Sequence, residues 1–303
     1  MRVSDNLRYE TFKNNIGELK SRIDKNQEMV ASQKKILNPS DGPVAMAQAI
    51  QLDSQKSRND QYTRNLTTIG LYAGMYETSL NSVQDSLTRA KELAIGMNTD
   101  TVTAESRKVA ADEVGKMIEQ LVGIGNTKVG NTYVFGGKKT SVPPFTLDTN
   151  PASPTYYSVT YSGTADVPEV YVSSGQTEKA GISGQQAFDV GGASDIFAIL
   201  KGFKQALEQN NKAGISSSLD NLDKAIDLTV SNISYTGVYS GAIDTIKNTL
   251  QSNTDTLTAV LSNLTDADMA GLISDYTLLT NSYEASLACM SKLQQLNVLN
   301  YLR

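Results

Sequence analysis

A heptad repeat of apolar residues between positions 62 and 97 constrains the fold more than any other feature of the sequence. The repeat steps by four and then three residues without interruption, through Tyr62, Leu66, Ile69, Ala73, Tyr76, Leu80, Val83, Leu87, Ala90, Ala94 and Met97. This spacing puts one apolar stripe along a helix and is typical of helices that pack side by side. Pro43 suits a first helical turn, so we predict one helix from Pro43 to Met97, about 80 Å long at ~1.5 Å per residue.

Such a helix needs neighbours, because helix propensity contributes little stability and the apolar stripe must be buried. Three later segments offer matching stripes. The first follows Thr103, the second follows Ser194 or Asp195, and the third is long and ends near residue 262. Their apolar residues are Ala110, Val114, Met117, Leu121 and Ile124; Ile196, Leu200, Phe203 and Leu207; and Leu222, Ile226, Ile233, Ile243, Leu250 and Leu257. Together these segments predict an antiparallel helical rod.

The middle of the chain has a different pattern. Residues 130–192 are rich in Gly and Pro. Apolar residues alternate at Tyr157, Val159 and Tyr161, and the run Val170-Tyr171-Val172 follows after a turn-like Ser162-Gly163. Alternation between turn residues indicates short strands. We therefore expect a small β-rich insert at residues 139–191.

The two ends of the chain return to the helical period. The N-terminal stripe runs from Tyr9 to Leu37, and the C-terminal stripe runs from Leu272 to Leu293. We expect an assembly interface on Leu7, Phe12, Ile16, Leu19, Ile23, Leu272, Tyr276, Leu279, Tyr283, Leu287, Met290 and Leu293. The stripes have two interpretations: an intramolecular coiled coil that closes the rod, or termini that become ordered only when subunits stack into a ring or filament.

These patterns predict a mainly α fold: a long antiparallel helical rod or coiled coil with paired N- and C-terminal helices, plus a small β-rich inserted domain. The expected division has three parts. Residues 1–42 with 263–303 form a terminal coiled-coil assembly region, residues 43–138 with 192–262 form a helical rod, and residues 139–191 form the outer insert.

The composition excludes most catalytic chemistry. The chain has no histidine, which removes the common general base, His-dependent nucleophiles and His-based zinc sites. Two carboxylate pairs, Asp266 with Asp268 and Asp220 with Asp223, are expected at helix starts, where acids favour the helix dipole. Gly136–Gly137 is expected to form a turn, because the residues after it do not continue as a phosphate-binding loop. We therefore expect no enzyme activity, cofactor or metal.

Charge and hydropathy limit which binding partners and which cellular compartment the sequence favours. The net charge of −5 and the absence of a basic stripe argue against nucleic acid. No apolar run is long enough for a signal peptide core or a membrane span. These observations alone indicate a cytoplasmic protein, and an extracellular role would require export without cleavage. The single cysteine, Cys289, excludes an internal disulfide and is expected to be buried.

Four stretches resemble one protein family, the bacterial flagellar hook–filament junction proteins, or hook-associated protein 3 family, of the flagellin-like superfamily. The first is the turn from Asn38 to Ala45, Asn-Pro-Ser-Asp-Gly-Pro-Val-Ala, in which Pro39 would end the first helix and Ser40 or Asp41 would cap the next. The others are Arg2-Val3-Ser4, the run from Gly130 to Gly137 with Pro144-Phe145, and the tail from Leu261 to Leu302. The β insert carries no resemblance.

Flagellin is the nearest alternative, because its termini and inserted outer domain look alike. Flagellins typically have a Ser-Gly-Leu-Arg-Ile-Asn-Ser stretch after the first helix, whereas this chain has Lys34-Lys35-Ile36-Leu37-Asn38-Pro39. The Asn300-Tyr301-Leu302 ending also looks like the junction family. Gly42, Glu284 and Asn300 depart from the family's usual residues.

The resemblance implies a structural adaptor of the extracellular flagellum that joins the hook, through the other hook-associated protein, to the flagellin filament. It also implies self-association into a ring, export through the flagellar type III apparatus without a cleaved signal peptide, and escort by a cytosolic chaperone. The chaperone would cover Leu279, Tyr283, Leu287, Leu296 and Leu299. A flagellin subunit is the first alternative function. The second is an adhesin or enzyme carried by the insert, suggested by Tyr156, Tyr157 and Tyr161.

Overall fold

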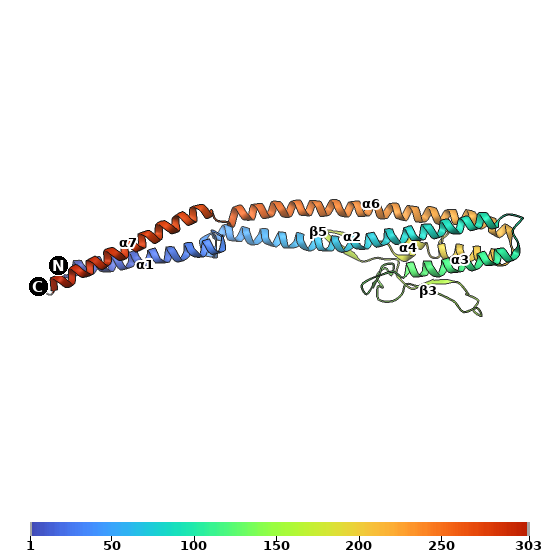
Figure 1. Cartoon of the computed structure of the whole chain (residues 1–303), viewed down its shortest axis with the longest axis horizontal. Coiled ribbons are helices and arrows are strands. Elements are labelled where there is room, and N and C mark those ends of the chain that lie inside the picture. The colour runs from blue at the N-terminus through green and yellow to red at the C-terminus, as the bar shows by residue number, and fades with distance from the viewer. Residues whose placement is uncertain (1, 302–303) are drawn as a thin grey trace. The chain divides into compact units, whose positions relative to one another are not determined.

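The computed structural model describes the backbone of residues 2–301 and the side chains of Leu7 and of residues 9–292. It divides into two compact units. The smaller comprises Met1–Arg58 and Asn253–Arg303, and the larger comprises Asn59–Ser252. Two long helices, α2 (Pro43–Met97) and α6 (Lys212–Thr265), contribute to both units and run antiparallel (Figure 1). The predicted mainly α fold is confirmed.

The heptad repeat forms the core of the larger unit. The side chains of its middle members, from Leu66 to Ala94, are at most 3% exposed, whereas Tyr62 and Met97 at its ends are half-buried. The predicted helix from Pro43 to Met97 is confirmed at both ends. The stripe packs on apolar residues of α3 (Ala104–Gly125), α5 (Ile196–Glu208) and α6.

The helix starts follow from local capping. Thr103 precedes α3 and its Oγ1 accepts a hydrogen bond from the N–H of Ser106 at 3.1 Å. Of the two predicted caps of α5, the structure uses Asp195, whose Oδ1 accepts the N–H groups of Phe197 and Ala198 at 3.0 Å. These bonds satisfy donors that a helix leaves unpaired in its first turn.

Residues 128–179 form three antiparallel strand pairs, of which the second and third lie in the insert at residues 139–191. These are β1 (Lys128–Val129) with β2 (Thr132–Tyr133), β3 (Phe145–Leu147) with β4 (Val159–Tyr161), and β5 (Glu169–Ser173) with β6 (Gln176–Lys179). A short helix, α4 (Gly184–Phe188), follows. The expected strands around Val159 and Tyr171 are present, but Tyr157 precedes β4 and adopts a left-handed backbone with φ of 59°.

Buried aromatic rings hold the insert against the helices. The Phe145 ring packs edge to face with Phe188 and at a tilt against Phe197, with ring centroids 4.9 and 5.4 Å apart. Asn126, at the end of α3, pairs with the Phe145 backbone through two hydrogen bonds of 2.8 and 3.0 Å. The insert is therefore packed onto the helical core of the larger unit.

The smaller unit contains α1 (Arg2–Ser32) and α7 (Met269–Tyr301), which lie side by side and antiparallel (Figure 1). The expectation that the first helix continues to Leu37 is wrong. Gln33 adopts a left-handed backbone with φ of 58°, and Lys34 pairs with Asp266 in an isolated β-bridge. This pairing with the chain after α6 ends α1 at Ser32, before the steric effect of Pro39 applies.

The turn before α2 also differs from the expectation. A short 3-10 helix, η1 (Pro39–Asp41), precedes α2, and the carbonyl of Gly42 accepts the first bond of α2, from the N–H of Met46 at 2.8 Å. Neither Ser40 nor Asp41 caps α2.

No helix described within residues 2–301 carries an apolar stretch long enough to cross a membrane.

Candidate assembly surfaces

The apolar stripes of α1 and α7 face each other within one chain. The half-buried members on α1 are Phe12, Ile16, Leu19 and Ile23, and on α7 they are Leu272, Tyr276, Tyr283 and Met290; Leu279 is buried. Most of the predicted assembly residues are thus brought together by intramolecular pairing. The predicted pairing of the terminal helices is confirmed.

Two predicted residues do not join this stripe. Leu7 is 69% exposed and Leu287 is 43% exposed. After Tyr283 the heptad step of three reaches Ser286, which is half-buried, so Leu287 lies beside the stripe rather than in it. The side chains of Leu293, Leu296 and Leu299 lie outside the described residues.

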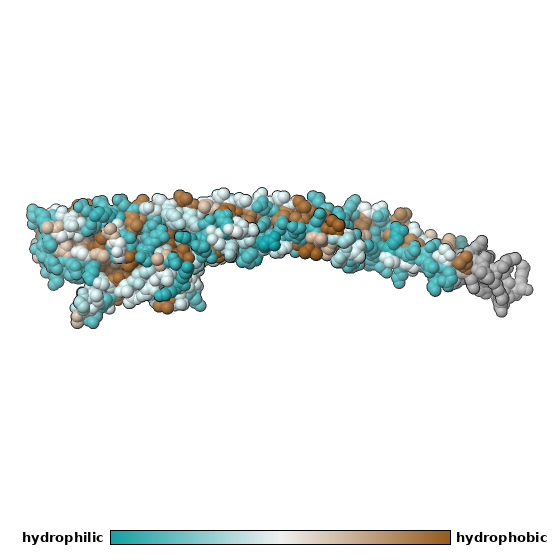
Figure 2. Space-filling view, turned by 180° about the vertical axis from the view of Figure 1, so that it is seen from behind, coloured by the Kyte–Doolittle hydropathy of each residue, from teal (hydrophilic) through white to brown (hydrophobic). Residues whose placement is uncertain are grey.

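Sequence reasoning missed two apolar side chains on α7. Ile273 is 54% exposed and Leu278 is 65% exposed. An apolar residue outside the buried stripe is a signal for a second contact, because a helix that is apolar on several faces is usually covered on all of them. Figure 2 shows hydrophobic side chains reaching the surface of the protein. Ile273, Leu278 and Leu287 are candidates for contacts that the single chain does not make.

A buried polar side chain interrupts the α1–α7 stripe. Asn26 is 5% exposed, and its Oδ1 has no hydrogen-bond partner among the described residues. It borders a cavity of about 280 Å³ together with Met29 of α1 and Leu272 and Leu279 of α7. A polar residue at a core position of paired helices fixes their register at a cost in stability.

The break between α1 and α2 lies against the break between α6 and α7. The N–H of Lys35 donates to the carbonyl of Thr265 at 2.8 Å, and the N–H of Ala267 donates to the carbonyl of Gln33 at 3.0 Å. Beside this bridge, hydrogen bonds from the hydroxyls of Ser262 and Thr265 hold the pKa of Asp266 below its usual value. We call residues 33–42 and 266–268 the crossing.

A second open groove lies between α2 and α6 in the smaller unit. Its volume is about 540 Å³, and it is lined by Gln48, Gln51, Leu52, Gln55, Val260, Asn263 and Leu264. Val44 and Ile50 on the same part of α2 are 71% and 61% exposed. Glutamine side chains and exposed aliphatic residues therefore share this surface of α2.

The carboxylate pairs have structural roles. Oδ1 of Asp268 accepts the N–H groups of Ala270 and Gly271 at 3.1 and 3.3 Å, as expected for the start of α7. Asp220 and Asp223, in contrast, lie inside α6, so that expectation is wrong. Asp223 forms an ion pair with Lys91 at 2.5 Å. Within the described residues no cluster of three or more His, Cys, Asp or Glu could hold a metal ion.

Tyr157 and Tyr161 of the insert are half-buried and pack against the protein itself, whereas Tyr156 is 36% exposed. The hydroxyl of Tyr161 donates to the carbonyls of Phe135 and Thr164 at 3.0 Å. Tyr156 and Tyr157 lie near the buried ammonium group of Lys204, with Nζ 5.9 and 4.6 Å from their ring centroids. Burial, followed by the nearby charge of Glu119, raises the pKa of Tyr157.

Cys289 is exposed on α7, so the expectation of a buried thiol is wrong. Its apolar neighbours in sequence, Leu287 and Met290, favour a buried thiol. Only Met290 is drawn into the stripe against α1, whereas Leu287 is itself exposed.

Comparison with known proteins identifies two helical regions. Residues 3–140 match the bacterial flagellin N-terminal helical region, and residues 219–302 match the bacterial flagellin C-terminal helical region. Together the two matches span most of the chain. They contain α1, α2, α3, most of α6, and α7.

Similarity over the full length points to one branch of these proteins. The chain is 24% identical to the flagellar hook-associated protein 3 of Escherichia coli (strain K12), with 98% of each chain covered. A putative flagellar hook-associated protein from Vibrio parahaemolyticus has the same fold, with a TM-score of 0.66 and 20% identity over 75% of this chain and all of that one. The flagellar junction protein FlgL from Legionella pneumophila gives a TM-score of 0.55 at 16% identity, covering 73% and 99% of the two chains. The chain belongs to the flagellin-like superfamily of bacterial flagellar proteins and, within it, to the hook-associated protein 3 family.

Proposed function

We propose that the chain is a structural adaptor of the bacterial flagellum that joins the hook, through the other hook-associated protein, to the flagellin filament. The full-length similarity to hook-associated protein 3 supports this role and does not favour a flagellin. The observation that carries the proposal is the paired α1 and α7, whose buried stripe leaves Ile273, Leu278 and Leu287 uncovered. A subunit that must bind copies of itself and two other proteins needs such surfaces.

The proposed contacts between subunits use the exposed apolar residues. Leu7, Ile273, Leu278 and Leu287 would pack on neighbouring subunits, while the stripe from Phe12 to Ile23 and its partners on α7 hold the terminal pair together. A repeated head-to-tail contact of this kind closes into a ring or extends into a filament. The three-part division expected from the sequence remains a proposal, with residues 1–42 and 263–303 as the assembly region.

The proposed export route requires the terminal pair to open. Leu279 and Tyr283, two of the proposed chaperone-binding residues, pack on α1 in the folded chain. A cytosolic chaperone could therefore cover them only before α1 and α7 pair. Unpaired termini also suit passage through a narrow export channel without a cleaved signal peptide. The protein would then reach its extracellular position at the hook–filament junction.

Deletion of the gene in its host tests the adaptor role. We expect electron microscopy to show hooks without filaments, and an immunoassay to detect unpolymerised flagellin in the medium. Loss of flagellin from both cells and medium would identify the chain as a filament subunit instead. Motile cells with normal filaments would contradict the adaptor proposal.

Substitution of neighbouring residues on α7 tests the subunit contact. Leu287→Asp places a charge on the exposed apolar surface, whereas Ala288→Asp changes the next residue, which is also exposed. We expect Leu287→Asp alone to abolish filament formation, with the circular dichroism of both purified variants unchanged. Normal motility of the Leu287→Asp strain would remove Leu287 from the interface.

Leu279→Asp provides a complementary test, because Leu279 is 8% exposed and packs within the terminal pair. We expect this variant to lose both junction assembly and the helicity of α1 and α7, while the larger unit stays folded. Retained helicity with lost assembly would instead place Leu279 itself between subunits.

A further inference from the structure

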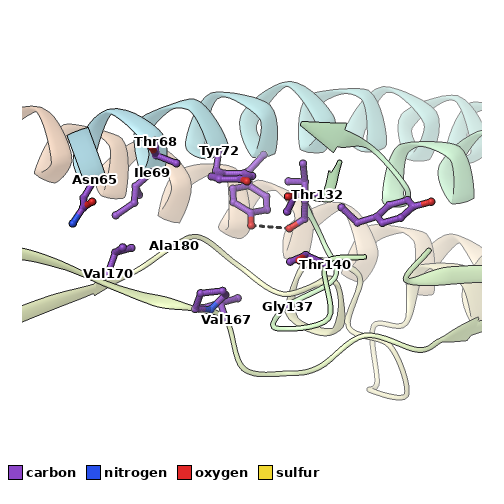
Figure 3. A pocket seen from close by; sticks show the side chains of 14 residues that line it. Asn65, Thr68, Ile69, Tyr72, Thr132, Gly137, Thr140, Val167, Val170 and Ala180 are labelled. Atoms are coloured by element: carbon purple, nitrogen blue, oxygen red, sulfur yellow. Dashed lines mark hydrogen bonds between the residues drawn. The ribbon is translucent and has the colours of Figure 1, made fainter. Parts of the chain in front are cut away.

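A cavity of about 320 Å³ lies in the larger unit, between α2 and the segments on either side of the β5–β6 hairpin (Figure 3). Asn65, Ile69 and Tyr72 line it from α2, and Pro168 and Val170 line it from the opposite wall. Its volume is at the small end of the range of about 300–1,000 Å³ that is usual for ligand sites. The adaptor role makes no use of this cavity.

Hydrogen bonds tie the walls of the cavity to each other. The Tyr76 hydroxyl on α2 donates to the carbonyl of Val134 at 2.9 Å, which is the dashed line in Figure 3. Nδ2 of Asn65 donates to the carbonyl of Tyr171 at 2.8 Å and fixes the hairpin to α2. A site whose walls are already tied together binds a ligand without an ordering cost.

The turn that closes one end is also fixed. The N–H of Tyr133 donates to the carbonyl of Thr140 at 2.9 Å, which joins the two sides of this turn. Within the turn, Gly137 has a φ of 64°, and a Cβ there would lie 2.2 Å from the carbonyl oxygen of Thr164. The backbone at Gly137 therefore lies close to the backbone at Thr164. The side chain of Thr140, in the same turn, lines the cavity.

The lining determines the chemistry of an occupant. No Lys, Arg, Asp or Glu is among the described residues around the cavity. A charged ligand would lose its hydration there without gaining a partner of opposite charge, which is costly. The rings of Tyr72, Tyr76 and Tyr133 favour a flat apolar group. The side chains of Thr132 and Thr140 place hydroxyl groups at one end, where a single polar group could be bound.

We propose that this cavity binds an uncharged small molecule of one or two rings, held against the tyrosine rings with one polar N–H or O–H group near Thr132 and Thr140. The site is formed by α2, the β1–β2 region and the β5–β6 hairpin of one chain. It is independent of the junction role, because every residue that lines it belongs to the larger unit.

Indole is a suitable probe, because it is uncharged, has two fused rings and one N–H donor. The chain contains no tryptophan, so red-edge excitation reports indole alone. We expect titration of the full chain into indole to raise the fluorescence anisotropy to saturation, with a Kd on the order of 0.1–1 mM, as for a small fragment. Indole-3-acetate, which carries a negative charge, should bind at least about tenfold more weakly, a loss of about 1.4 kcal/mol.

Adjacent threonines provide a matched pair of variants. Thr67 and Thr68 are both exposed on α2, and each hydroxyl donates to the carbonyl four residues earlier, but only Thr68 lines the cavity. Thr68→Phe should obstruct the cavity and weaken indole binding at least about tenfold, a loss of about 1.4 kcal/mol. Thr67→Phe should bind as the unchanged protein does, and circular dichroism should be the same for both variants.

Three results would overturn the proposal. The first is the absence of saturation with the unchanged protein, and the second is equal binding by Thr67→Phe and Thr68→Phe. The third is self-association of the protein that indole reverses, because the occupant would then be a side chain of a second copy rather than a small molecule.

Discussion

Nζ of Lys25 on α1 lies 2.5 Å from Oδ1 of Asp41, in the turn that precedes α2. Oδ2 of the same carboxylate accepts the N–H groups of Leu37 and Asn38 at 3.2 and 3.0 Å. The hydrogen bond from Lys25, followed by that from the Asn38 backbone, holds the pKa of Asp41 below its usual value. One carboxylate thus joins the first helix to the crossing.

The lowered pKa of Asp41 predicts how stability depends on pH. The ionised carboxylate is favoured in the folded protein, so its contribution is complete above the unfolded pKa of about 3.9 and is lost as the pH falls through the lower folded pKa. We expect the melting temperature to fall below about pH 4. Lys25→Met should make this fall smaller, while Lys13→Met, at an exposed position of α1, should leave it unchanged. Identical pH profiles for Lys25→Met and the unchanged protein would contradict the prediction.

The hydroxyl of Tyr76 is predicted to stabilise the larger unit. Tyr76 is 3% exposed, and burial raises its pKa. Tyr76→Phe leaves the carbonyl of Val134 without this donor, which should lower the free energy of unfolding by about 1–3 kcal/mol. Tyr171→Phe is the control, since Tyr171 is 62% exposed. Urea denaturation followed by circular dichroism measures both variants, and equal midpoints would show that the buried hydrogen bond contributes nothing net.

Gly181 is predicted to tolerate no side chain. Its φ is 127°, and a Cβ at this position would lie 2.0 Å from Cε2 of Tyr76. We expect Gly181→Ala to lower the free energy of unfolding by roughly 3 kcal/mol or more, from backbone strain and overpacking combined. Gly175→Ala isolates the strain, because Gly175 has φ of 85° with no neighbour within 4 Å of a Cβ. It should cost only about 1 kcal/mol, and a similar loss for both variants would mean that the Tyr76 ring moves aside.

Arg107 is predicted to hold together the turns at one end of the larger unit. Its guanidinium group donates to the carbonyls of Met97 and Thr99 at 3.0 and 2.8 Å and to Oδ1 of Asn210, and the residue is 6% exposed. Arg107→Ala should destabilise the unit by roughly 3 kcal/mol or more. Arg107→Lys should recover less than half of that loss, because an ammonium group cannot reach three acceptors in one plane.

The matched control for Arg107 is Arg64→Ala, since Arg64 is an exposed arginine of α2 that bonds Gln61. This variant should change the melting temperature very little. Full recovery by Arg107→Lys would show that charge, rather than the planar geometry, is what the turns require.

The helices could be predicted because the spacing of their apolar residues depends only on residues three or four positions apart. Each member of the repeat from Tyr62 to Met97 constrains the next, and both ends of α2 coincide with the expected positions. The end of α1 could not be predicted, because it depends on pairing with Asp266, a residue more than two hundred positions away. Capping was predictable at Thr103 and Asp195, where the cap and its donors are close in sequence.

The candidate surfaces were predicted only in part. The sequence shows that α7 carries apolar residues, but a helical turn of about 3.6 residues allows either Ser286 or Leu287 to follow Tyr283 on one face. Packing against the partner helix determines which of the two is covered: Ser286 is half-buried and Leu287 is exposed. The cavity near Tyr72 had no sequence signal, because the residues joined across it are 58 and 106 positions apart in the chain.

The crossing has a mechanical consequence for a flagellar component. The bonds from Lys35 to Thr265 and from Ala267 to Gln33 fasten the two connecting segments to each other. The directions of α1 and α7 are therefore coupled, because one connecting segment cannot turn without the other unless both bonds break.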